Sequence, residues 1–253
     1  MTLATISLDA AAAAAERSSA RAGVTVLELR TPAETERAAE LLREVWRGPE
    51  MPVPANILRT VQHTGGYVFG AYDERGTLLA TSMGLLAGGS TLHSHITGVA
   101  PSGQRRGLGL ALKQHQRWWA LAHDLPVITW TCDPLVRRNV AFNLHALGAE
   151  VHAYLPDHYG AMTDGVNSGD DSDRFELRWD LAGPRATRAA EERLPWVSGP
   201  RTVPLPEDIE AVRRRDPAAA RRWRRTVRES VVPALAAGAV VTGLDAHGAL
   251  VLS

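Results

Sequence analysis

A run of polar and glycine residues, Gln104-Arg105-Arg106-Gly107-Leu108-Gly109, separates a candidate strand from a candidate helix near the middle of the chain. The first amides of a helix have no partners within it, and the helix dipole adds positive potential there, so such a junction can bind an anion. Gly107 and Gly109 leave room for a pyrophosphate beside the backbone. The run differs from a Walker A loop, which ends in Gly-Lys-Ser/Thr, and from the three-glycine dinucleotide motif. By spacing alone, a phosphate site and a plain tight turn are equally good interpretations.

Two histidines precede this run on the same candidate strand. His93 and His95 occupy alternate positions, so both side chains point to one face. Imidazole changes charge near neutral pH, which makes the pair candidates for a general base. The alternative is a pair of half-buried structural histidines, and the sequence favours neither interpretation.

The hydrophobic pattern predicts the elements that must position these residues. A helix over 32–46 begins with a capping box between Thr31 and Glu34, and a short helix over 55–62 follows. Three strands, a long helix from Leu108, and then a strand, a helix and two strands come next. Their expected ranges are 67–71, 78–86 and 92–99 for the first strands, 127–132 for the next strand, 136–147 for its helix, and 149–155 and 174–181 for the last two strands. Consecutive strands favour antiparallel pairing and strand–helix–strand units favour parallel pairing, so the predicted class is α/β with a mixed sheet.

The two ends of the chain are expected to lie outside a central domain over 23–182. Residues 1–22 are rich in alanine and carry acidic Asp9, which argues against a secretory signal and favours a flexible, partly helical leader. A linker rich in proline and glycine is expected over 183–204 and an extension packed on the core over 205–253, with helices over 206–215 and 217–229 and a hairpin around 240–252. The tail arginines are expected to form a solvated face opposite a docked Trp223, with nucleic-acid or CoA-phosphate binding as alternatives; they are Arg221, Arg222, Arg224, Arg225 and Arg228.

Composition excludes several classes of protein. Hydrophobic residues make up 45% and charged residues 22%, which is typical of a globular chain and not of a disordered or fibrous one. Basic and acidic residues balance at 28 each, which removes the simplest argument for a nucleic-acid or membrane partner. No stretch approaches the roughly 18 consecutive apolar residues of a membrane span. The single cysteine, Cys132, can form no internal disulfide and suits a reducing cytoplasm.

The glycine run, preceded by Val99-Ala100-Pro101, resembles the acyl-CoA motif Gln/Arg-x-x-Gly-x-Gly/Ala of the GNAT acyltransferase superfamily. Other stretches are similar to a bacterial subgroup of predicted GNAT acetyltransferases, and together they extend over nearly the whole chain after about residue 22. They are Leu92-His93-Ser94-His95, Thr129-Trp130-Thr131, Asp133-Pro134-Leu135, Arg138-Asn139, Asn143-Leu144, Leu147-Gly148-Ala149, Tyr159-Gly160, Ser172-Asp173-Arg174, Val203-Pro204-Leu205-Pro206 and Trp223-Arg224. The resemblance implies a mixed, mostly antiparallel central sheet, splayed at the acyl-CoA site, with a small C-terminal helix–hairpin extension.

The same resemblance implies which residues hold acetyl-CoA or another acyl-CoA. Backbone amides of the glycine run would bind the pyrophosphate, and the strand before it would pair with pantetheine, with one amide polarising the thioester carbonyl. The implied cofactor-binding residues are Thr97, Gly98, Val99, Gln104, Arg105, Arg106, Gly107, Leu108, Gly109, Leu110, Asn139 and Asn143. The implied acceptor contacts are Trp130, Asp133 and Arg174, of which Arg174 would pair with a substrate carboxylate.

The chemistry implied is direct attack of a small amine, such as an amino acid, on the thioester, with acetyl as the default group and succinyl or another acyl group open. An alkyl ammonium of pKa about 10 is only about one part in a thousand free base at pH 7, so a base is useful. His95 is preferred to His93 because it should lie nearer the thioester. Leu144 stands where many GNAT enzymes have the Tyr that protonates the leaving thiolate, so Tyr159, Tyr154, water and unaided departure all stay open. A covalent route through Cys132 is the less favoured alternative.

The loop over 161–173 holds four aspartates but lacks the register of a calcium-binding loop, so we expect no metal. The resemblance implies that this loop forms a wall of the acceptor pocket. A homodimer is open as an assembly of the chain. The alternative function is a non-catalytic acyl-CoA-binding regulatory module, which the missing Tyr favours and the complete glycine run opposes.

Overall fold

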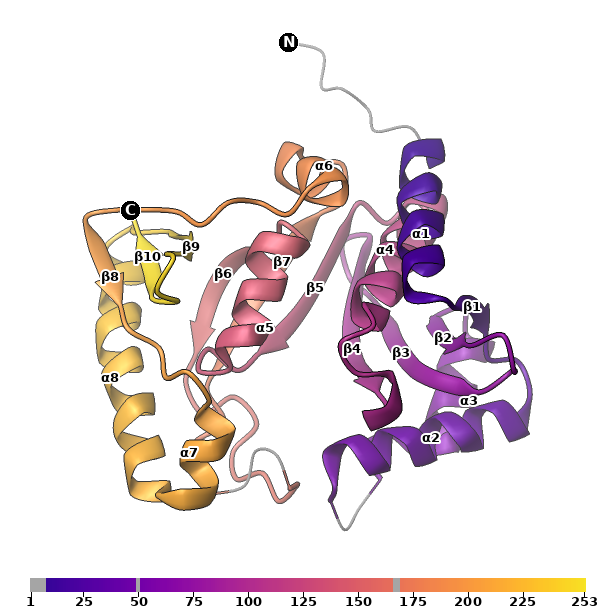
Figure 1. Cartoon of the computed structure of the whole chain (residues 1–253), viewed down its shortest axis with the longest axis horizontal. Coiled ribbons are helices and arrows are strands. Elements are labelled where there is room, and N and C mark those ends of the chain that lie inside the picture. The colour runs from indigo at the N-terminus through magenta and orange to yellow at the C-terminus, as the bar shows by residue number, and fades with distance from the viewer. Residues whose placement is uncertain (1–7, 49–50, 166–168) are drawn as a thin grey trace. The chain divides into compact units, whose positions relative to one another are not determined.

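The computed structural model describes residues 8–48, 51–165 and 169–253, and the chain forms two compact units. The N-terminal unit is Met1–Thr129 with Asp180–Gly183, and the C-terminal unit is Trp130–Trp179 with Pro184–Ser253. The chain therefore passes between the units inside the strand Val127–Cys132, and again between residues 179 and 180 and between residues 183 and 184. Figure 1 traces the elements from indigo at the N-terminus to yellow at the C-terminus.

The N-terminal unit is built on a sheet with the order β1-β2-β3-β4-β5, in which neighbours are antiparallel except for the parallel pair β4 and β5. Its strands are β1 (Thr25–Glu28), β2 (Tyr67–Tyr72), β3 (Leu78–Ala87), β4 (Thr91–Val99) and the first half of β5 (Val127–Cys132). Its helices are α1 (Leu8–Ala22), α2 (Pro32–Trp46), α3 (Ala55–His63), the 3₁₀ turn η1 (Pro101–Gly103) and α4 (Leu108–Ala122).

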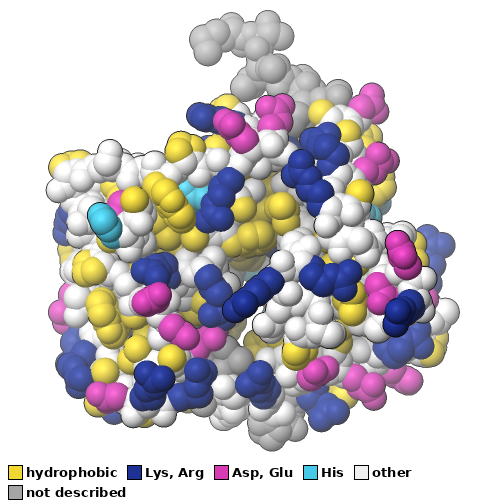
Figure 2. Space-filling model, in the orientation of Figure 1, with side chains coloured by type: hydrophobic (Ala, Val, Ile, Leu, Met, Phe, Trp, Pro, Cys, Tyr) yellow, Lys and Arg dark blue, Asp and Glu magenta, His cyan; other side chains and the backbone are white. Residues whose placement is uncertain are grey.

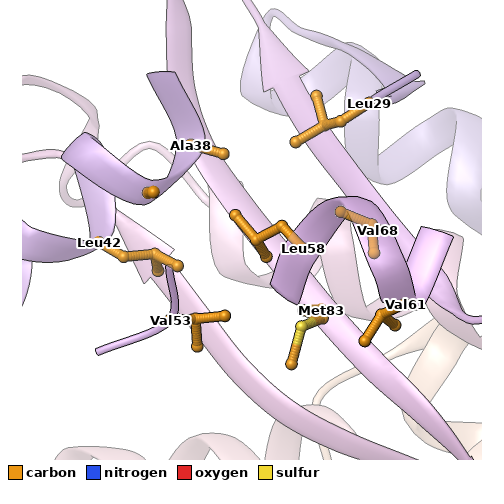
Figure 3. Packing of buried hydrophobic residues seen from close by; sticks show 9 residues of the cluster. Leu29, Ala38, Leu42, Val53, Leu58, Val61, Val68 and Met83 are labelled. Atoms are coloured by element: carbon orange, nitrogen blue, oxygen red, sulfur yellow. The ribbon is translucent and has the colours of Figure 1, made fainter. Parts of the chain in front are cut away.

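Apolar side chains cover both faces of this sheet. On one face, α2 and α3 pack on β2 and β3 through a cluster that contains Leu42, Leu58, Val68 and Met83 (Figure 3). On the other face, α1 and α4 pack on the same strands through a second cluster: Ala22, Ala71, Leu79, Ala80, Leu108, Ala111 and Leu112. The sheet is thus held between two helical layers, and the junction between β4 and α4 is anchored on both sides.

The leader expected to be flexible and partly helical is helical over residues 8–22, which form the packed helix α1; residues 1–7 lie outside the described part of the chain. Ala11, Ala14, Ala15 and Ala22 are buried, and α1 packs along α4. The small alanine side chains let the two helices approach closely, which gives this segment a packed face that its composition did not reveal.

The C-terminal unit contains the second half of β5 and two further strands in the order β5-β7-β6, together with a small three-stranded sheet. Its remaining strands are β6 (Glu150–Leu155), β7 (Arg174–Asp180), β8 (Arg201–Val203), β9 (Val241–Leu244) and β10 (Leu250–Leu252). Its helices are α5 (Arg137–Ala141), the π-helical turn η2 (Phe142–Ala146), α6 (Pro184–Glu191), α7 (Ile209–Arg215) and α8 (Pro217–Ala236). β6 and β7 are antiparallel, as are β8, β10 and β9.

The mixed, mostly antiparallel sheet and the C-terminal helices with their hairpin are confirmed. Three details differ from expectation. The single helix over 136–147 is a short α-helix continued by a π turn, the linker over 183–204 contains α6 and β8, and α8 runs on to Ala236 through Pro233. Among the described helices, none has both the length and the apolar character needed to cross a membrane.

Candidate functional site

The glycine run forms an exposed turn that leads from the end of β4 into α4. Arg105 and Gly107 both adopt left-handed backbone conformations, with φ of 64° and 83°, and Gly107 is the N-cap of α4. Within the described residues, no side chain caps this helix and no acidic residue lies in its first turn. The amides of Leu108, Gly109 and Leu110 therefore keep donors without an intrahelical partner. A Cβ on Gly107 would meet open space, so the turn leaves room for an anionic group such as a pyrophosphate.

The two arginines of this turn differ in their surroundings. Arg106 donates from Nη2 to the carbonyl oxygen of Ala22 at 3.2 Å, which ties it to the end of α1. Arg105 and Gln104 are exposed beside it. Arg105 is therefore the better placed of the two to reach a bound phosphate.

The end of β4 presents backbone groups on the side away from β3. The pairing of β4 with β5 extends over three residue pairs only within the described residues, from Thr91↔Val127 to His93↔Thr129. The Ala100 amide donates to Leu79 of β3 at 2.9 Å, and alternate residues of a strand direct their amides to the same side. The amides of Thr97 and Val99 consequently point to the opposite side, where β4 has no paired register with β5. An extended ligand chain could pair with them there.

His95 lies at a break in the regular pairing of β4. Met83 pairs with Ile96 and Gly84 pairs with Ser94, so His95 is the extra residue of a β-bulge. Bulges re-aim a side chain and recur beside active sites. The His95 side chain is exposed, yet it lies close enough to protein atoms for desolvation to lower its pKa. The rings of His93 and His95 lie 6.4 Å apart.

A buried lysine fastens β4 to α4 beside this bulge, and the sequence analysis missed it. Lys113 donates from Nζ to Ser94 Oγ at 2.7 Å and to Gln116 Oε1 at 3.2 Å. It is the only lysine in a chain with 28 basic residues, which was the signal that could have drawn attention to it. Because Ser94 precedes His95, this bond fixes the backbone from which the histidine projects.

In the C-terminal unit, Tyr159 presents its hydroxyl to the second half of β5. The hydroxyl lies 2.9 Å from Thr131 Oγ1, and the side chain is 46% exposed. The Arg174 guanidinium lies 5.3 Å from the centre of the Tyr159 ring and donates to the Asp173 carbonyl at 2.9 Å. The structure thus brings together the expected acid candidate Tyr159 and the expected carboxylate partner Arg174.

The other tyrosine considered for the acid role is unsuitable. Tyr154 is buried and its hydroxyl donates to Asp173 Oδ2 at 2.5 Å. Burial, and then the carboxylate of Asp173, raise its pKa above the usual value for a tyrosine. Leu144, where the sequence resemblance implied a Tyr position, is fully buried in η2. Of the side chains weighed for the acid role, only the exposed Tyr159 can reach a ligand.

The remaining expected contacts differ in exposure. Asn139 is exposed on α5, whereas Asn143 is buried in η2. Trp130 is buried edge-on against Trp179, at 6.0 Å between ring centres, and therefore belongs to the core.

Asp133 is buried and bound by arginines from the two C-terminal helices. Its Oδ1 accepts from Arg224 at 2.6 Å, and its Oδ2 accepts from Arg224 at 3.1 Å and from Arg213. Burial opposes the charge, but these hydrogen bonds and charges lower the Asp133 pKa to about 2. Both carboxylate oxygens are already engaged, so Asp133 serves internal packing and not the acceptor contact expected of it.

The expected arrangement of the tail helix is also wrong. Arg224 is 2% exposed, while Trp223 is only half-buried. The arginine turns inward because it meets buried Asp133 and Asp170, which the sequence places far from it in the chain. Figure 2 shows basic and acidic side chains mixed over the face that it displays, and such a mixture does not favour nucleic-acid binding. Within the described residues, no group of three or more His, Cys, Asp or Glu is arranged to hold a metal ion.

Comparison with known proteins identifies the fold. No family model matches the sequence, and no curated protein sequence matches it. Among solved structures, the ribosomal-protein-S18-alanine N-acetyltransferase from Escherichia coli matches with a TM-score of 0.51 and 15% identity, over 62% of this chain and 94% of that one. A spermidine N-acetyltransferase chimera from Vibrio cholerae and hSSAT matches with a TM-score of 0.52 and 12% identity, over 68% and 99%. An N-acetyltransferase from Staphylococcus aureus matches with a TM-score of 0.51 and 13% identity, over 62% and 98%.

The chain has the GNAT fold. The matches span nearly all of each solved chain but leave about a third of this one outside, so this GNAT fold carries additional structure. At these identities the likeness shows the fold alone.

Proposed function

We propose that this protein is an acyl-CoA-dependent N-acyltransferase that transfers an acetyl or other acyl group to the amine of a small metabolite. The observation that carries the proposal is the junction of β4 and α4. There, a bulged strand with outward amides leads directly into an uncapped helix start that contains a left-handed glycine. A GNAT fold with this junction is suited to hold the pantetheine chain and pyrophosphate of CoA.

Each part of the junction has a proposed role. The amides of Leu108–Leu110, with Arg105, would hold the pyrophosphate, since donors at a helix start favour negative charge. The amides of Thr97 and Val99 would pair with pantetheine, and one of them would donate to the thioester carbonyl as negative charge develops there. The bound thioester supplies an electrophilic carbonyl carbon and a thiolate leaving group.

His95 and Tyr159 would move the protons. The acceptor nitrogen forms a bond to the carbonyl carbon, the carbon–sulfur bond breaks, and the ammonium proton passes to His95. Its lowered pKa keeps His95 neutral and able to accept a proton at pH 7. Tyr159 would donate a proton to the departing thiolate in place of the tyrosine that Leu144 replaces. Arg174 beside it would pair with an acceptor carboxylate, which favours an amino acid or a related metabolite.

Calorimetric titration of the purified chain with acetyl-CoA, succinyl-CoA and free CoA tests the donor site. We expect micromolar binding with a preference for one acyl group. Gly107→Asp should weaken binding by about tenfold or more relative to Gly107→Asn, which corresponds to about 1.4 kcal/mol or more. The two side chains match in size and in tolerance of the left-handed conformation, and only aspartate places a charge beside the pyrophosphate.

The outcomes are distinct. Equal affinity of the Asp and Asn variants would remove the turn from the binding site. Binding of acyl-CoA without turnover across a panel of amines would favour the regulatory-module alternative, which the buried Leu144 supports.

A further inference from the structure

We infer that Arg228 and Arg224 of α8 are positioning residues for the Tyr159 hydroxyl, so that the C-terminal helices are part of the acyl-transfer machinery. The inference rests on the proposed function, in which Tyr159 protonates the leaving thiolate. The contacts that carry it lie within the C-terminal unit.

One face of α8 points toward the segment 169–173, a glycine followed by four polar residues. Arg221, Arg224 and Arg228 are spaced three and four residues apart and so share a face of the helix. Arg221 donates to the Gly169 carbonyl at 3.3 Å, and Arg224 donates to Asp170 Oδ2 at 2.8 Å. Arg228 binds two neighbouring carboxylates: it donates to Asp171 Oδ2 at 2.7 Å and from Nε to Asp173 Oδ2 at 2.8 Å.

The segment 169–173 also holds the backbone turn that carries Tyr159. Asp173 accepts from the Asp157 amide at 3.0 Å through Oδ1. Its neighbour Ser172 accepts from the Tyr159 amide at 2.8 Å, and the Ser172 hydroxyl donates to Asp157 at 3.1 Å. An unbroken series of hydrogen bonds therefore connects Arg228 to the backbone of the tyrosine.

The residues of this connection are buried next to α8, whereas Tyr159 at the other end is exposed. The Asp170 and Asp173 side chains are 1% and 0% exposed, so each needs its arginine to offset the loss of water. The Tyr159 side chain, by contrast, is exposed, with its hydroxyl beside Thr131 and its ring beside Arg174. Without the arginines, the turn would have several alternative conformations, and the hydroxyl would leave its place beside β5.

Arg228 is the residue to test, because its side chain is 30% exposed and its loss leaves the buried Arg224–Asp133 pair intact. Arg228→Gln removes the charge, and Arg228→Lys keeps the charge but cannot form bidentate hydrogen bonds. Arg225→Gln, which changes an exposed arginine of the same helix, is the control. Each change is made in the full-length chain, alone and together with Tyr159→Phe.

A double-mutant cycle separates positioning from a general effect on folding. We expect Tyr159→Phe to lower kcat about a hundredfold and Arg228→Gln to lower it about tenfold, with the KM for acyl-CoA changed less than about twofold. In the Tyr159→Phe background, Arg228→Gln should have almost no further effect, because the hydroxyl it positions is absent. Arg228→Lys should recover part of the loss, and Arg225→Gln should match the wild type.

Hydrogen exchange gives a second readout that does not depend on turnover. Arg228→Gln should speed exchange of the Asp157 and Tyr159 amides at least about tenfold and leave those of α4 unchanged. Unchanged exchange at these two amides, or an equal loss of kcat in both backgrounds, overturns the inference while acyl transfer by the wild type upholds the proposed function. A wild type that transfers no acyl group to any amine overturns both.

Discussion

His95 illustrates how one residue of extra length in a strand can create a candidate base. Its side chain is exposed at the bulge, and partial desolvation lowers its pKa. His93 lies two residues earlier in the strand. Its Nδ1 is 3.4 Å from Thr129 Oγ1, and its backbone pairs regularly with β5. The sequence placed both histidines on one face, but only the bulge distinguishes them.

The pH dependence of kcat/KM should report this difference. A protonated imidazole cannot take a proton from the amine, so kcat/KM should fall as the pH drops through the His95 pKa. The midpoint of this acidic limb of the pH profile should lie below the usual histidine pKa of about 6.5. His95→Gln should lower kcat/KM about a hundredfold and abolish the limb. His63→Gln, which changes an exposed histidine on α3, serves as the control. A limb that persists in His95→Gln would assign the base to another group.

At the scale of elements, the predictable features were those with local causes. The capping box of α2 is present, with Glu34 accepting from the Thr31 amide at 2.8 Å, and β5 has the predicted range Val127–Cys132. The π turn η2 and the packing of α1 on α4 depend on contacts distant in sequence, which periodicity does not encode. The same holds for Arg224 and Arg228, whose aspartate partners lie 54 to 91 residues away in the chain.

Buried Asp133 should make the stability of the protein depend on pH in the acidic range. Its pKa is about 2 in the folded chain and near 4 when unfolded, so the stability it contributes is complete above about pH 4 and is lost as the pH falls toward 2. Asp133→Asn should unfold at a lower temperature at pH 5, because two buried arginines lose a charged partner, and should lose less stability between pH 5 and 3.

Thermal unfolding followed by circular dichroism measures both effects. Glu74→Gln, in an exposed turn, is the control and should behave as the wild type. If the unfolding temperatures of the wild type and of Asp133→Asn changed equally with pH, the arginine–aspartate cluster would contribute little to folding.

At the scale of the molecule, the fold was predictable from the chain and the candidate site was predictable in part. The glycine run predicted the turn at the start of α4 to which we assign the donor site, since Gly107 acts through its backbone and its type alone permits the conformation. The proposed acid could not be chosen from the sequence, because the burial that separates Tyr154 from Tyr159 depends on the folded structure. The extension over 205–253, which was expected to pack on the core, shares a compact unit with β6 and β7.

The most direct test of the proposed activity is a turnover assay on the full-length chain with acetyl-CoA and a panel of amino acids and simple amines. Release of CoA thiol and the mass of the product are followed together. The account predicts thiol release that requires the amine, equals the acetylated amine in amount, and leaves the protein without a covalent acetyl group. Acetylation of Cys132 during turnover would contradict direct transfer, and no amine-dependent thiol release with any acceptor would contradict the central claim.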